Sequence, residues 1–310
     1  MIKSHQRTKS IRVNGVDLHY TETGKGAPVL LVHGSLSDFR TWGLQRKAFS
    51  KHYHVIAYSR RHHYPNAQTR DKAHYTPAVH ADDLAAFIQA RKLGAVHLIG
   101  SSYGAYVSLL MAAKHPELVR TLVLGEPPIL GLLKNDARGG ILLKKFLDTA
   151  WKPAVRALHA GDDESGARFF YDGISSPGSF ERLPQSVRAG MMENVPAMRR
   201  EARETDELFR FPRRDALKIT APSFLLSGEL SPELFHRITD ILEDRLPRSE
   251  RAVIHGASHS MHAHRPQAYN KAVLRFLALH EDPLQQGEAN QTLSKNAQEV
   301  GRSSKGPLKH

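Results

Sequence analysis

The chain has 310 residues, of which 40% are hydrophobic and 24% charged, a composition typical of a soluble globular protein that can bury a sizeable core. It contains no cysteine, so disulfides, thiolate metal sites and a cysteine nucleophile are excluded. The formal net charge is +13, but the basic residues are scattered in pairs and do not gather on one element with interleaved aromatic residues. We therefore expect a generally basic surface and no nucleic-acid partner.

No targeting or membrane segment is apparent. Residues 1–10 are expected to form a loose basic arm, and no apolar stretch follows them that would indicate a secretory signal. The longest apolar runs, at residues 28–32 and 221–226, have the length of strands and are far too short to cross a bilayer. We therefore expect no membrane span and a cytoplasmic location.

Apolar and amphipathic segments then alternate along the chain. An Asn-Gly turn at residues 14–15 predicts a hairpin of strands 11–13 and 16–22. Further strands are predicted at residues 29–32, 54–58, 95–99 and 121–124, and helices at 41–49, 78–93 and 103–115. This alternation favours an α/β fold with a mostly parallel central sheet flanked by crossover helices.

The strand signal disappears between residues 127 and 218, where we predict short helices separated by prolines and glycines. Strands return at 223–227 and 252–255, and a last helix is predicted at 266–280. The chain is thus predicted to form one α/β core, residues 11–126 and 219–280, with a helical cap inserted at 127–218. Residues 281–310 are polar and nearly free of aliphatic side chains, so they are expected to be disordered.

The central chemical motif is Gly100-Ser101-Ser102-Tyr103-Gly104, which follows an apolar strand directly and precedes a helix. A sharp strand-to-helix turn would lift the Ser102 hydroxyl above the sheet, and the flanking glycines would let the two backbones approach. The helix N-terminus would then present unpaired N–H groups where negative charge develops. We predict that Ser102 is a nucleophile and that Ser101 lies off the line of attack.

Two further segments complete this constellation. The strand at 29–32 ends in His33-Gly34-Ser35, and we expect the Ser35 backbone N–H to form an oxyanion hole with that of Tyr103. Near the end of the chain, His259 lies in a loop between the last strand and the last helix. A neutral imidazole delivered from a loop suits a general base, so His259 is preferred over His255, His262 and His264.

These motifs resemble the α/β-hydrolase family over residues 11–280: a His-Gly after the third strand, the nucleophile elbow, a helical cap, and Gly-x-Ser-His before the last helix. The resemblance implies an α/β-hydrolase fold and the chain order serine, acid, histidine. One segment departs from the family pattern. Residues 58–66, YSRRHHYPN, stand where many members carry Asp-x-Arg-Gly-x-Gly-x-Ser, and they resemble a bacterial-type subgroup that indicates no substrate.

The acid is a second departure. Most α/β-hydrolases place it three residues beyond the glycine that ends the strand after the cap, but here that position holds Ser231, and Glu229 lies only one residue beyond the glycine. The other known location is the end of the strand before the cap, as in some haloalkane dehalogenases and zearalenone-type lactonases. Glu126 occupies it, so the resemblance implies Glu126 as the acid; a glutamate that merely starts the cap is the alternative.

The function that these residues favour is hydrolysis of a small carboxylic ester or lactone through an acyl-enzyme, without cofactor or metal. A serine at the elbow argues against haloalkane dehalogenases and epoxide hydrolases, which use aspartate there. Carbon–carbon bond hydrolysis, cofactor-free peroxidase chemistry, and a ligand receptor with little turnover stay open. Nothing in the sequence indicates the oligomeric state. Expected substrate-pocket residues are Leu36, Leu130, Trp151 and Met191, and Leu132, Leu133, Phe169, Phe170 and Met192 are further candidates from the cap.

Overall fold

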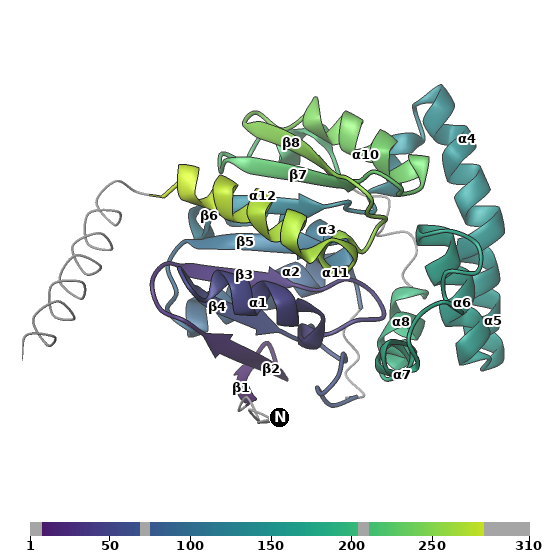
Figure 1. Cartoon of the computed structure of the whole chain (residues 1–310), viewed down its shortest axis with the longest axis horizontal. Helices are drawn as coiled ribbons and strands as arrows, with labels where there is room; N and C mark the ends of the chain where they lie inside the picture. Colours follow the sequence, from purple (N-terminus) through teal and green to yellow (C-terminus); the bar gives the residue numbers. More distant parts are fainter. Residues whose placement is uncertain (1–7, 69–74, 204–210, 282–310) are drawn as a thin grey trace, which may run out of the picture.

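The computed structural model describes residues 8–68, 75–203 and 211–281, and its centre is a single eight-stranded sheet (Figure 1). The spatial order of the strands is β1-β2-β4-β3-β5-β6-β7-β8. Their bounds are β1 Lys9–Val13, β2 Val16–Thr23, β3 Pro28–Val32, β4 His54–Tyr58, β5 Val96–Ser101, β6 Val119–Gly125, β7 Ser223–Gly228 and β8 Ser249–Ile254. The pairs β1–β2 and β2–β4 are antiparallel and all the others are parallel.

Helices cover both faces of this sheet. One face packs against α1 (Gly43–Phe49) and α12 (Pro266–Leu279), and the other against α2 (Pro77–Ala90), α3 (Tyr103–Lys114) and α10 (Glu233–Glu243). Successive residues of the central strand β3 alternate between the two cores, Leu30 facing one and Leu31 the other. This alternation follows from the pleat of a strand and explains why β3 is apolar throughout.

The chain leaves the sheet after β6 and forms the cap at the carboxyl ends of the parallel strands (Figure 1). The cap elements are η3 Leu130–Leu133, α4 Ala137–Phe146, η4 Leu147–Trp151, α5 Lys152–Ala160, α6 Asp163–Ile174, α7 Gln185–Met192 and α8 Val195–Glu201. A short helix, α9 (Arg213–Ala216), contacts α3 before the chain re-enters the sheet at β7. No helix in the described ranges is long and apolar enough to cross a membrane.

The predicted fold class is confirmed, with differences in detail. Helix α10, between β7 and β8, was not predicted, although Leu234, Ile238 and Leu242 recur every four residues and are buried in the core. Residues 9 and 10, expected in the basic arm, pair with β2 as part of β1. The rest of that arm and residues 282–310 of the expected disordered tail lie outside the described residues.

Candidate active site

Ser102 lies at the turn between β5 and α3 with φ 54° and ψ −124°, a backbone conformation that a residue with a Cβ rarely adopts. Its N–H donates to the carbonyl of Gly125 at 2.7 Å, which ties the turn to the next strand. The motif glycines are required by close packing: a Cβ on Gly100 would lie 2.5 Å from the α3 backbone, and one on Gly104 would lie 2.3 Å from the Val32 carbonyl oxygen. The sequence therefore builds an elbow with its serine at the apex.

The loop after β3 lies directly beside this serine. A Cβ on Gly34 would lie 3.1 Å from the Ser102 Cβ, closer than most Cβ contacts, so glycine favours this approach. Ser35 follows, and within the described residues its N–H donates no backbone hydrogen bond. Tyr103 is the first residue of α3, so its N–H has no acceptor within the helix. The Ser35 and Tyr103 N–H groups, which have no backbone acceptor among the described residues, are thus the candidate donors of an oxyanion hole beside Ser102.

Glu126 follows β6 with φ 46°, and its side chain lies fully buried beneath the His259 loop. One carboxylate oxygen, Oε2, accepts a hydrogen bond from His259 Nδ1 at 2.6 Å, and the other accepts the Gly228 backbone N–H at 2.8 Å. The His259 ring stacks on Phe235 with ring centroids 4.2 Å apart. With the Nδ1 proton directed to Glu126, His259 Nε2 is left as a base, and it has no partner within the described residues.

The other candidate groups make no hydrogen bond to His259 within the described residues, although His262 lines the same cavity as Ser102 and His259. Glu229 is half exposed and binds the Gly256 N–H at 2.8 Å and His255 Nδ1 at 3.1 Å. His262 is buried and bonded to Thr41 Oγ1 at 2.9 Å, and burial, followed by the charges of the neighbouring histidines, lowers its pKa to about 3. The structure thus brings Glu126, and not Glu229, to His259.

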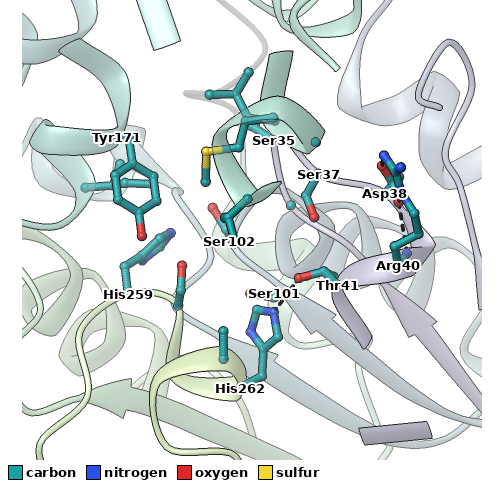
Figure 2. A pocket seen from close by; sticks show the side chains of 18 of the residues that line it. Ser35, Ser37, Asp38, Arg40, Thr41, Ser101, Ser102, Tyr171, His259 and His262 are labelled. Atoms are coloured by element: carbon teal, nitrogen blue, oxygen red, sulfur yellow. Dashed lines mark hydrogen bonds and ion pairs between the residues drawn. The ribbon is translucent and has the colours of Figure 1, made fainter. Parts of the chain in front are cut away.

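Two cavities meet at Ser102. The wider one, about 410 Å³, is lined by Ser102, His259 and several further hydroxyl side chains (Figure 2). The narrower one, about 30 Å³, is lined mainly by apolar and aromatic cap and core residues. Of the expected pocket residues, Leu36 and Met191 line the wider cavity and Leu130 and Trp151 the narrower one. Phe170 lines both, whereas Leu132, Leu133, Phe169 and Met192 line neither.

Three buried residues that contact this site were not predicted from the sequence. Phe235 lies on α10, the helix that was missed, and Arg60 and Glu201 form an ion pair behind the Gly34–Ser35 peptide. The unusual segment 58–66 was the only sequence signal for Arg60. Among the described residues no group of three or more histidine, aspartate or glutamate side chains is arranged to hold a metal ion.

Comparison with known proteins identifies the family. The sequence matches the model of the alpha/beta hydrolase family over residues 29–272. The chain belongs to this family. Relatives of the alpha/beta hydrolase type include the uncharacterized hydrolase YraK of Bacillus subtilis, 30% identical over 127 residues, a match that covers 41% of this chain and 47% of that protein.

A putative esterase/lipase of Haemophilus influenzae is 22% identical over 282 residues, covering 88% of this chain and 91% of the relative. Among solved structures, an enol-lactonase from Burkholderia xenovorans superimposes with a TM-score of 0.70 at 19% identity, covering 87% of this chain and all of that one. These matches confirm the predicted alpha/beta hydrolase family and fold.

Proposed function

We propose that this protein is a serine hydrolase that cleaves a carboxylic ester or lactone through an acyl-enzyme. The observation that carries the proposal is the 2.6 Å contact between Glu126 and His259 Nδ1, which leaves Nε2 without a partner among the described residues in a histidine that lines the same cavity as Ser102. Similarity to a putative esterase/lipase and an enol-lactonase supports the same chemistry.

In the proposed mechanism, His259 Nε2 takes the Ser102 hydroxyl proton while Oγ attacks the carbonyl carbon. The carbonyl oxygen becomes an oxyanion, held by the Ser35 and Tyr103 N–H groups. The C–O bond to the alcohol then breaks, and the His259 imidazolium gives its proton to the leaving oxygen. Water, deprotonated by His259, attacks the acyl-enzyme by the same route and releases the acid. Glu126 fixes the His259 tautomer and stabilises the imidazolium.

We assign the two ends of the substrate to the two cavities. The leaving oxygen must lie near His259 because it receives the imidazolium proton, and His259 lines the wider cavity but not the narrower one. The alcohol part therefore occupies the wider, hydroxyl-lined cavity. The acyl part occupies the narrower apolar cavity, whose volume of about 30 Å³ suits a short chain.

The charge of the cavity walls favours an uncharged substrate. Among the described lining residues Arg40 is the one arginine or lysine, and its guanidinium is already bound by Asp38, at 2.6 and 2.8 Å, and by Glu193 at 2.6 Å. Among the described residues, no free cation therefore lies at these walls to hold a carboxylate group of a substrate. An uncharged ester or lactone fits this arrangement.

Two measurements test the proposal. A fluorophosphonate probe should label the wild-type protein and p-nitrophenyl acetate should be hydrolysed; Ser102→Ala should abolish both, and Ser176→Ala, at an exposed serine, should change neither. Labelling that survives Ser102→Ala would show that another residue is the nucleophile. Absence of turnover across a panel of esters and lactones would instead favour a ligand-binding protein that keeps the fold.

A further inference from the structure

A fully buried ion pair joins the cap to the core behind the proposed oxyanion hole. Arg60 lies in the segment after β4, Glu201 is the last residue of α8, and Arg60 Nη2 lies 2.9 Å from Glu201 Oε1. The exposed fractions of the two side chains are 0% and 2%. Burial by itself would raise the pKa of Glu201. The charge of Arg60 opposes this effect, as do His63 and the Ser35 hydroxyl, and together they hold the pKa of Glu201 at about 2. Glu201 is therefore a carboxylate at neutral pH.

The Arg60 side chain contacts both segments that carry the oxyanion-hole donors. Its Nε donates to the His33 carbonyl at 3.2 Å and its Nη2 to the Gly34 carbonyl at 3.0 Å. Its guanidinium carbon lies 4.5 Å from the centre of the Tyr103 ring. Arg60 thus holds the loop after β3 from behind while it packs on the first residue of α3.

The hydrogen bonds to the Gly34 carbonyl fix the direction of the Ser35 N–H, one of the two proposed oxyanion-hole donors. The Gly34 carbonyl accepts hydrogen bonds from Arg60 Nη2 and, at 2.8 Å, from His33 Nδ1. The other ring nitrogen of His33, Nε2, accepts the Arg60 backbone N–H at 2.9 Å. In a trans peptide the carbonyl and the next N–H point in opposite directions. With the Gly34 carbonyl held on the Arg60 side, the Ser35 N–H is directed away from Arg60, and Ser102 lies against the same Gly34.

Glu201 connects this arrangement to the cap. Its carboxylate binds the same Nη2 that holds the Gly34 carbonyl, and it faces the Ser35 hydroxyl. We propose that Arg60 and Glu201 are positioning residues that orient the Ser35 N–H, so that docking of α8 on the core completes the oxyanion hole. This inference rests on the proposed serine-hydrolase function, because it assigns a role to the Ser35 N–H in that reaction.

The chemistry of a buried ion pair supports a positioning role. Removing two charges from water is costly, and well-packed apolar residues often stabilise a fold as well as such a pair does. Loss of one partner, by contrast, leaves an unpaired buried charge and is strongly destabilising. A double substitution that removes both charges can therefore restore stability without restoring the hydrogen bond to the Gly34 carbonyl. Such a variant separates a positioning role of the pair from a purely stabilising one.

The test compares Arg60→Met, Arg60→Met/Glu201→Gln and a matched control, Glu233→Gln. Glu233 of α10 also forms an ion pair between core and cap, with Arg138 of α4, but that pair is exposed and lines neither cavity. Each protein is assayed for melting temperature, for kcat and KM with p-nitrophenyl acetate, and for inhibition by a trifluoromethyl ketone. That ketone forms an oxyanion on the nucleophilic serine, so its affinity reports on the oxyanion hole.

We expect Arg60→Met to lower both the melting temperature and kcat. The double variant should recover most of the melting temperature while kcat and ketone affinity stay about 10- to 100-fold below wild type, with KM within about twofold, because one of two donors is misdirected. Glu233→Gln should match wild type. Recovery of kcat together with stability in the double variant would overturn the inference and leave the proposed function standing. Failure of the wild-type protein to hydrolyse the ester or bind the ketone would overturn both.

Discussion

The buried carboxylate of Glu126 lies 2.6 Å from His259 Nδ1, although the two residues are 133 positions apart in the chain. Two parallel strands, β6 and β7, make this contact possible, because Glu126 follows β6 and its other oxygen is held by Gly228 at the end of β7. The acid therefore approaches the histidine from the strand before the cap.

Glu126→Gln is expected to lower kcat by roughly 10³- to 10⁴-fold while the fold is retained, because an amide NH₂ facing Nδ1 would favour the wrong tautomer of His259. Ester turnover and the melting temperature of the purified variant are the measurements. Glu229→Gln is the matched control, since Glu229 is half exposed and its carboxylate binds the His255–Gly256 turn instead of His259. A large loss of kcat in Glu229→Gln with normal activity in Glu126→Gln would reverse the assignment.

The narrower cavity predicts a preference for short acyl chains. Wild-type protein should hydrolyse p-nitrophenyl acetate with a kcat/KM at least about tenfold above that for the octanoate, because a 30 Å³ apolar space does not admit a long chain. Trp151→Leu enlarges the narrower cavity and should reduce the ratio of kcat/KM for the acetate to that for the octanoate. Met191→Ala, in the wider cavity, should leave this acyl preference unchanged. The idea fails if the wild-type protein already prefers the octanoate.

Two kinds of feature could be predicted from the sequence: motifs that are contiguous in the chain, and side chains whose place follows from the order of the strands. The elbow at Ser102 could be found because its glycines and its place between strand and helix are contiguous in the chain. The contact of Glu126 with His259 could be predicted because a resemblance to other hydrolases offered two places for an acid, and Ser231 cannot carry a charge at one of them.

The Arg60–Glu201 pair could not be predicted, because it joins positions 141 residues apart across the cap and core. Nothing in the pattern around Glu201 distinguishes it from the exposed carboxylates of the cap. Its burial depends on how α8 docks, and that is decided by tertiary packing. Phe235 was missed for a different reason: its helix α10 has a clear apolar stripe that was not recognised.

Stability should fall in mild acid because of buried neutral histidines, and His97 on β5 offers a clean test. Burial, followed by the charges of Arg120 and His280, lowers its pKa to about 3, and Nδ1 pairs with Thr121 Oγ1 at 2.8 Å. Between pH 6.5 and 3 the unfolded state binds the extra proton, so the free energy of unfolding decreases as pH falls, by up to about 1.4 kcal/mol per pH unit for this group.

His97→Gln removes that proton uptake and should flatten the dependence of unfolding free energy on pH between 6.5 and 4 by close to one proton. Guanidinium titrations at several pH values give this slope. His159→Gln, at an exposed histidine, is the control and should keep the wild-type slope. An unchanged slope in His97→Gln would mean that His97 is protonated in the folded protein.

Two glycine-to-alanine substitutions in helices should have opposite effects. In α3, a Cβ on Gly104 would lie 2.3 Å from the Val32 carbonyl oxygen and 2.4 Å from that of His33, and these backbone atoms cannot move without displacing β3. In α4, a Cβ on Gly140 would meet nothing within 4 Å. Gly104→Ala should therefore lower the free energy of unfolding by about 3 kcal/mol or more and disturb the elbow. Gly140→Ala should raise it by about 0.5–1 kcal/mol, through helix propensity alone.

Thermal melts measure both changes, because a change of 1 kcal/mol in the free energy of unfolding shifts the melting temperature of a chain of this size by roughly 2–4 °C. Equal melting temperatures for the two variants would show that the elbow does not need a glycine at position 104.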